Sequence, residues 1–102
     1  MSLHVIEILV MEESDVAQAT RQALSMSRDI GFSKSQAHYI ATATAELAAN
    51  MLIHAGGGRI ELKALQDPKG IEVRAIDHGP GISDIELALS EGYSTVGGLG
   101  CG

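Results

Sequence analysis

The stretch Ala41–Ala55, ATATAELAANMLIHA, constrains the fold more than any other part of the chain. It contains no Gly or Pro, and apolar residues occur nearly all the way round the helical wheel, which is typical of a buried helix. Four polar residues nevertheless recur at every fourth position and therefore share one face: Thr42, Glu46, Asn50 and His54. A buried carboxylate or amide is costly unless it has a partner. The polar face is therefore either an ordinary solvent-facing stripe or a set of side chains directed at a ligand.

The preceding residues predict a strand and an amphipathic helix. His4–Val10 is rich in β-branched residues and predicts the strand. Ser14 or Asp15 is a suitable helix N-cap, with Gln18 at capping-box spacing from Asp15. Apolar residues then recur every three or four positions up to Gly31, which predicts the end of this helix.

A second helix is predicted to begin at Ser33, with Gln36 as its capping-box partner, and to run to about Ala55. Beyond Gly56–Gly58, the segments 59–66 and 71–77 both alternate between apolar and charged residues. Such one-sided alternation predicts an antiparallel hairpin whose apolar face is covered by the two helices. The inward residues would be Ile60, Leu62, Ala64, Ile71, Val73 and Ala75, and period two then places Asp77 on the same covered face.

The composition changes after Asp77. Residues 78–82 predict a turn, Ser83 or Asp84 would cap a short helix through about Leu89, and the Gly-rich residues 91–102 predict a mobile loop. No element after this loop closes the sheet. We therefore expect residues 1–102 to be a single domain that is incomplete at its C-terminal end.

Composition excludes several classes of protein. The net charge is −6, and the seven Lys and Arg residues are scattered, so no basic stripe for nucleic acid is present. The chain has neither an apolar run of membrane-spanning length nor a signal peptide, which favours a cytoplasmic protein without membrane contacts. Its single cysteine, Cys101, fits a reducing compartment. A phosphate ligand would have to be held by backbone N–H groups and a metal ion.

Three short motifs are individually weak. Glu46 and Asn50 stand one helical turn apart, and an amide oxygen suits Mg²⁺ while a carboxylate can orient or deprotonate a nucleophile. Asp77-x-Gly79-x-Gly81 combines an acceptor for an exocyclic amine with glycines that admit a flat ring, although it could be a plain turn. Gly97–Gly102 offers free N–H groups for phosphate oxygens, although it could be a disordered end.

Taken in order, these motifs resemble the N box, G1 box and G2 box of the Bergerat-fold (GHKL) ATPases, the superfamily of gyrase, histidine kinases and MutL. The chain is most similar to the RsbT-like switch serine/threonine kinases of bacterial partner-switching modules, which are related to the anti-sigma factor kinases. The stretch DHGPGISDIELALSEGYSTVGGLGCG carries much of this likeness. Family members continue past the G2 box with a further helix and two strands.

The resemblance implies roles for individual residues. Glu46 would be catalytic, Asn50 would bind Mg²⁺, and Asp77 would recognise adenine in a pocket shaped by Gly79 and Gly81. His54 would pack and hydrogen-bond, while roles for Ser94 and Thr95 stay undecided. The phosphates of ATP would be covered by a loop that contains Gly98, Gly100 and Gly102.

The resemblance also implies a fold, a reaction and partners. The fold would be a two-layer α/β (α+β) sandwich, with a mostly antiparallel sheet and helices on one face. The enzyme would transfer the γ-phosphate of ATP to a STAS-domain antagonist protein, with a phosphatase or a sigma factor as its alternate partner. Three alternatives stay open: an anti-sigma factor with kinase activity, a histidine kinase catalytic domain, and a non-catalytic interaction module. The histidine kinase would need a phospho-acceptor helix, for which residues 1–4 leave no room.

Overall fold

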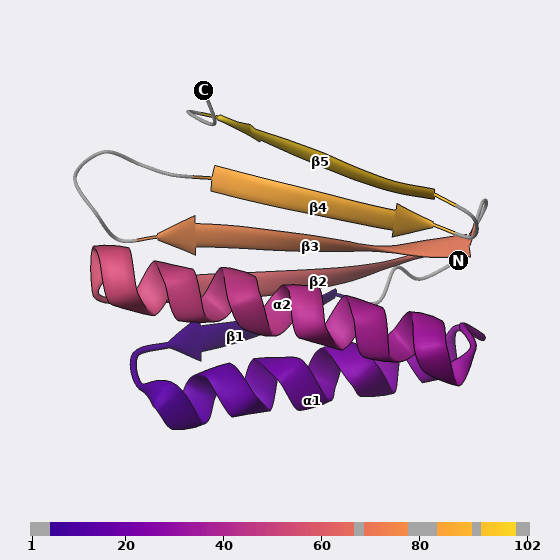
Figure 1. Cartoon of the computed structure of the whole chain (residues 1–102), viewed down its shortest axis with the longest axis horizontal. Coiled ribbons are helices and arrows are strands. Elements are labelled where there is room, and N and C mark those ends of the chain that lie inside the picture. Colours follow the sequence, from indigo (N-terminus) through magenta and orange to yellow (C-terminus); the bar gives the residue numbers. More distant parts are fainter. Residues whose placement is uncertain (1–4, 67–68, 78–83, 91–92, 100–102) are drawn as a thin grey trace.

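A computed structural model describes the backbone of residues 5–66, 69–77, 84–90 and 93–99, and the side chains up to residue 77. Two helices lie against one antiparallel sheet (Figure 1). The elements follow one another as β1 (Val5–Val10), α1 (Glu13–Asp29), α2 (Lys34–Ala55), β2 (Gly58–Gln66), β3 (Lys69–Asp77), β4 (Asp84–Ser90) and β5 (Tyr93–Leu99).

Helix α1 begins earlier than the sequence predicted. Its N-cap is Glu12, and Asp15 is the capping-box partner instead of the cap itself. The Asp15 carboxylate accepts hydrogen bonds from the backbone N–H groups of Met11 at 2.9 Å and Glu12 at 3.2 Å. The predicted Asp15–Gln18 box is therefore wrong, because Asp15 uses its carboxylate on N–H groups that precede it. At the other end, Gly31 adopts a φ of 104°, which favours glycine and ends the helix as expected.

The predicted limits of α2 are confirmed. The Ser33 hydroxyl accepts from the Gln36 N–H at 3.2 Å, and the Gln36 side chain accepts from the Ser33 N–H at 3.0 Å. The helix ends at Gly56, which lies in the left-handed region at a φ of 76°. Its N–H donates to the Leu52 carbonyl at 3.1 Å and satisfies one of the last free carbonyls of the helix.

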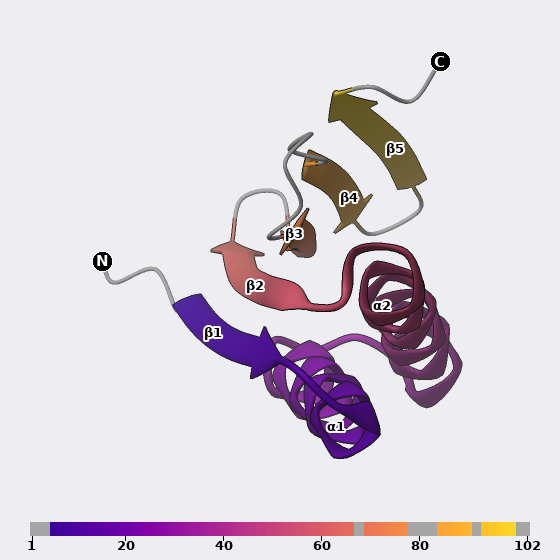
Figure 2. The same cartoon turned by 90° about the vertical axis from the view of Figure 1, so that its left-hand side faces the viewer.

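The strands lie in sequence order, β1-β2-β3-β4-β5, and every neighbouring pair is antiparallel. Both helices lie on the same side of this sheet (Figure 2), so the predicted two-layer sandwich is confirmed. The hairpin of β2 and β3 is confirmed as well. Its inward residues are at most 5% exposed and form the centre of the core: Ile60, Leu62, Ala64, Ile71, Val73 and Ala75. Of the turn predicted between these strands, Lys69 and Gly70 belong to β3, whereas residues 67 and 68 lie outside the described part.

Two predictions for the C-terminal quarter are wrong. The segment expected to be a short helix is strand β4, and residues 93–99 of the expected loop form strand β5. The register gives the reason for β4, because its apolar residues alternate at period two. Ile85, Leu87 and Leu89 stand opposite the apolar residues of β3, namely Ala75, Val73 and Ile71. Strand pairing also satisfies the backbone groups of β3, which a helix at this place would leave open.

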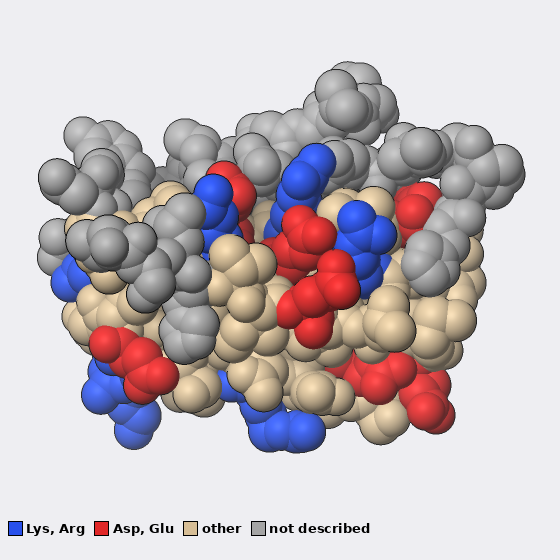
Figure 3. Space-filling model, turned by 180° about the vertical axis from the view of Figure 1, so that it is seen from behind, with Lys and Arg blue, Asp and Glu red and all other residues tan. Residues whose placement is uncertain are grey.

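The opposite face of the sheet carries charge. Arg59 Nε lies 3.1 Å from Glu7 Oε2 and 3.2 Å from Glu61 Oε2, and Arg74 lies 3.8 Å from Glu61. Seen from this side, acidic and basic side chains gather at the middle of the face (Figure 3). Within the described ranges, no helix is both long enough and apolar enough to cross a membrane.

Candidate functional site

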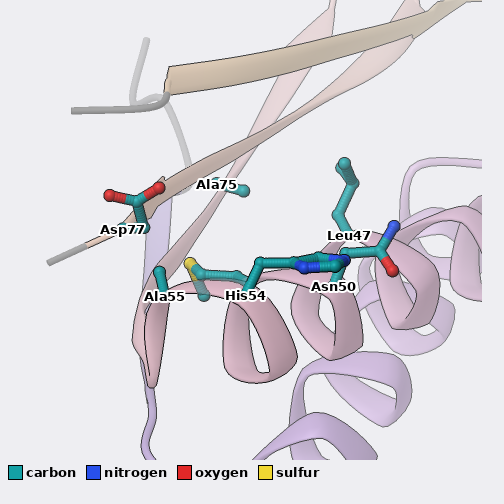
Figure 4. Close-up of a pocket in the computed structure, with 7 residues that line it drawn as sticks. Leu47, Asn50, His54, Ala55, Ala75 and Asp77 are labelled. Atoms are coloured by element: carbon teal, nitrogen blue, oxygen red, sulfur yellow. The ribbon is translucent and has the colours of Figure 1, made fainter. Parts of the chain in front are cut away.

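A hollow of about 190 Å³ lies between the C-terminal half of α2 and the end of β3 (Figure 4). It combines apolar walls with three polar side chains. One wall is helical and one belongs to the sheet, so residues almost thirty positions apart in the sequence meet here. The lining residues are Leu47, Asn50, Met51, His54, Ala55, Ala75 and Asp77.

Asp77 is the last residue of β3 and enters the hollow from the sheet side. It lies two positions after Ala75 on the same strand face, as period two predicted, and both residues line the hollow. The side chain is half-buried. Asp77 therefore shares the lining of the hollow with Ala75, as the strand period predicts.

Gly58 positions Asp77, and sequence reasoning missed this role. Gly58 lies in β2 directly opposite Asp77, and on its other side it pairs with Val10 of β1. A Cβ atom at Gly58 would lie 2.7 Å from the Asp77 Cα and 2.5 Å from the Met51 sulfur, and would collide with the Ile76 carbonyl oxygen. Only glycine permits this close approach of β2 to β3, beneath the Met51 side chain of α2. The run Gly56–Gly58 is the sequence signal for it, although the pattern by itself predicts only the end of α2.

The polar face of α2 divides into two parts. Asn50 and His54 line the hollow, whereas Thr42 and Glu46 lie outside it, and all four side chains are exposed. Thr42 and Glu46 therefore face solvent outside the hollow. Asn50 and His54 are exposed as well but border the hollow, and their binding of a ligand stays a prediction.

The prediction that α2 is buried on nearly all sides is wrong. Its core face is formed by Ala37, Ile40, Ala41, Thr44, Ala48 and Met51, yet Tyr39 is 58% exposed and Ile53 is 73% exposed. The reason is the placement of the helix at the surface of a two-layer fold, where the sheet and α1 can cover only part of it. The Thr44 hydroxyl, although buried, donates to the Ile40 carbonyl at 2.8 Å and so needs no other partner.

The side chains of the hollow suit a nucleotide with a divalent cation. Asp77 offers carboxylate oxygens to an exocyclic amine, and the apolar walls suit a flat ring. Asn50 offers the oxygen ligand that Mg²⁺ accepts. Among the described residues, no group of three or more His, Cys, Asp or Glu side chains could form a metal centre.

The glycines expected at the nucleotide fall mostly outside the described residues. Of these glycines, Gly79, Gly81, Gly100 and Gly102 lie outside the described ranges. Their roles stay predictions. Gly98 lies in β5, opposite Ile85 of β4. The expectation that Gly98 belongs to a loop is therefore wrong.

Comparison with known proteins gives the family of this chain. The histidine kinase-like ATPase domain family matches residues 9–101. The chain is also 37% identical over 97 residues to the serine/threonine-protein kinase RsbT of Bacillus subtilis (strain 168), covering 93% of this chain and 73% of that protein. No solved structure gives a significant match.

These findings confirm the resemblance that rested on the three motifs, and with it the expectation of a kinase that uses ATP. The family match spans both walls of the hollow, from β1 to the Gly-rich end of the chain. The chain therefore belongs to the histidine kinase-like ATPase domain family.

Proposed function

We propose that this protein is a serine/threonine-protein kinase of a bacterial partner-switching module. In this proposal it transfers the γ-phosphate of ATP to a hydroxyl of a STAS-domain antagonist protein. The observation that carries the proposal is the hollow lined by Asn50 and His54 of α2 and Asp77 of β3, in a chain similar to a serine/threonine-protein kinase. Residues 1–102 would act as one ATP-binding kinase domain in the cytoplasm, with a phosphatase or a sigma factor as the alternate partner.

Asp77 would select the base. Its carboxylate would accept a hydrogen bond from the exocyclic amine of adenine, whereas guanine presents a carbonyl oxygen at the corresponding position. A carboxylate facing that oxygen would leave two acceptors opposed and would disfavour GTP. The apolar side chains of Leu47, Met51 and Ala75 support this assignment because they provide a surface for the flat ring.

Asn50 would hold the cation and Glu46 would act on the acceptor. Bound Mg²⁺ would neutralise charge on the transferring phosphate. The acceptor oxygen forms the new bond to the γ-phosphorus, the bond to the bridging oxygen breaks, and ADP leaves. The hydroxyl proton passes to Glu46, whose exposed position one helical turn before Asn50 supports contact with an incoming protein.

The glycines would complete the site. Gly79 and Gly81 follow Asp77 directly in the sequence and would shape the base pocket. Gly100 and Gly102 would bring backbone N–H groups to the phosphates, which is the charge-free means of binding that the acidic composition requires.

Calorimetry of ATP and GTP binding, with and without Mg²⁺, tests this proposal. We expect Mg²⁺-dependent binding that favours ATP, and we expect the Asp77→Asn variant to lose at least tenfold in ATP affinity. Asp29→Asn is a matched control, because Asp29 is an exposed carboxylate at the end of α1. Equal affinity for ATP and GTP, or an unchanged affinity in Asp77→Asn, would contradict the role of Asp77.

A transfer assay tests the acceptor. The chain would be incubated with labelled ATP and each STAS-domain protein of the source organism. Label on a serine or threonine of one such protein is the expected result. Binding of ATP without transfer to any of them would contradict the proposed substrate class while leaving the nucleotide site intact.

A further inference from the structure

The outer face of α2 carries a second pattern, which has a period of seven. Tyr39, Glu46 and Ile53 are seven residues apart, and seven residues are close to two helical turns. The three side chains therefore form one straight row along the helix, which we name the outer row. All three are exposed, and Ile53, at 73%, is the most exposed large hydrophobic residue of the described part.

The outer row points away from the core but borders the hollow. At 3.6 residues per turn, Glu46 lies about 40° around the helix from Asn50, which lines the hollow. Ile53 comes one position before His54, so it lies about 100° around the helix from that lining residue and does not itself line the hollow. The row is therefore placed beside the nucleotide site, where an acceptor could approach.

Single exposed hydrophobic residues are normal on protein surfaces, and neither Tyr39 nor Ile53 would by itself require an explanation. Their placement around one carboxylate is the unusual feature. Each lies about 10 Å along the helix from Glu46, since the rise is 1.5 Å per residue. An exposed apolar side chain thus lies on either side of Glu46, the residue assigned to the acceptor hydroxyl.

We propose that the outer row is the docking surface for the acceptor protein, with Tyr39 and Ile53 as anchors that place its hydroxyl at Glu46. This inference rests on the proposed function. The row spans about 21 Å along the helix, which exceeds what a small acceptor molecule could cover but suits a protein surface. The acceptor would present a serine or threonine between two apolar patches. Tyr39 suits this role because tyrosine is enriched among the residues that supply most of the binding energy in interfaces, and Ile53 can serve as an aliphatic anchor in a pocket of the partner.

Steady-state kinetics of Tyr39→Ala and Ile53→Ser tests the inference, with the STAS-domain protein that the wild-type chain phosphorylates as the acceptor. We expect the KM for the acceptor to rise at least tenfold in each variant, while ATP affinity by calorimetry and the thermal unfolding midpoint stay at wild-type values. Leu9→Ser is the matched control. Leu9 is 59% exposed, but it lies on β1, remote from the hollow.

The possible outcomes are distinguishable. If the wild-type chain binds ATP but phosphorylates no STAS-domain protein, the proposed substrate fails and the docking inference fails with it. If the wild-type chain does transfer phosphate and both variants keep the wild-type KM, the docking inference alone is overturned. If the variants instead abolish self-association in sedimentation experiments, the outer row binds a second copy of the chain, and the inference is also wrong.

Discussion

The hairpin of β2 and β3 and the helix α2 differ in how well polarity matches burial. In the hairpin, the apolar residues of the alternation are buried, and charged residues such as Glu61 and Arg74 lie on the other face. In α2, a threonine is buried while a tyrosine and an isoleucine are exposed. Residues that follow the pattern of their element serve the core, and departures from it occur where function is expected. In α2 the two exposed departures, Tyr39 and Ile53, both belong to the outer row.

The largest effect is expected at Glu46, on the outer face of α2. Glu46→Gln should lower phosphate transfer by about 10²–10⁴-fold, the usual contribution of a general base. ATP affinity should not change, because Glu46 lies outside the hollow. Transfer of labelled phosphate and calorimetry would measure the two quantities, with Glu13→Gln on α1 as the exposed control. A parallel loss of ATP affinity would show that Glu46 belongs to the binding site and would remove the distinction between the two halves of the polar face.

Two adjacent residues test the faces of α2 directly. Ile40 is 2% exposed and Tyr39 is 58% exposed. Ile40→Ala should lower the free energy of unfolding by about 2–5 kcal/mol through loss of buried area and formation of a cavity. Tyr39→Ala should change it by no more than about 0.5 kcal/mol. Urea unfolding measures both free energies. Similar losses in the two variants would mean that the Tyr39 side chain packs against the rest of the protein and stabilises it.

Gly58 tests the connection between the helix and the hairpin. Gly58→Ala should destabilise the fold by about 1–3 kcal/mol through overpacking and should also weaken ATP binding, because the added methyl group displaces Asp77. Gly56→Ala is the control. It also costs about 1–2 kcal/mol, for its positive φ, but a Cβ atom there meets no neighbour within 4 Å. Thermal unfolding and calorimetry should therefore show similar stabilities and different ATP affinities; equal affinities would refute the positioning role of Gly58.

The smallest effect is expected on the charged face of the hairpin. Arg59→Gln removes the ion pairs with Glu7 and Glu61, whose side chains are 56% and 26% exposed. Exposed pairs contribute at most about 1 kcal/mol, and salt screens them. The free energy of unfolding, measured at low and high salt, should therefore fall slightly in this variant, and the difference from the wild-type chain should shrink as salt is added. A larger loss of unfolding free energy that does not depend on salt would show that these ion pairs stabilise the fold more than exposed pairs usually do.

Much of the fold could be predicted because its signals are local. The Ser33–Gln36 capping box, the helix end at Gly56 and the alternation in β2 and β3 each depend on residues close together in the sequence. The prediction of the α1 N-cap is wrong because several acidic and hydroxyl residues stand together there. The choice among them depends on which carboxylate reaches which N–H group. The helix predicted at the position of β4 is wrong because the apolar spacing of a short segment is ambiguous between helix and strand.

The sequence alone determined the family, the two helices, the central hairpin and the face on which Asp77 lies, since each of these follows from spacing along one chain segment. The tertiary structure decided which polar residues of α2 reach the hollow, why Gly58 must be glycine, and that Tyr39 and Ile53 stay exposed. The physical reason is that burial and close approach depend on neighbours from other elements. A helix sequence defines its faces, but only the packing of sheet and helices determines which face is covered.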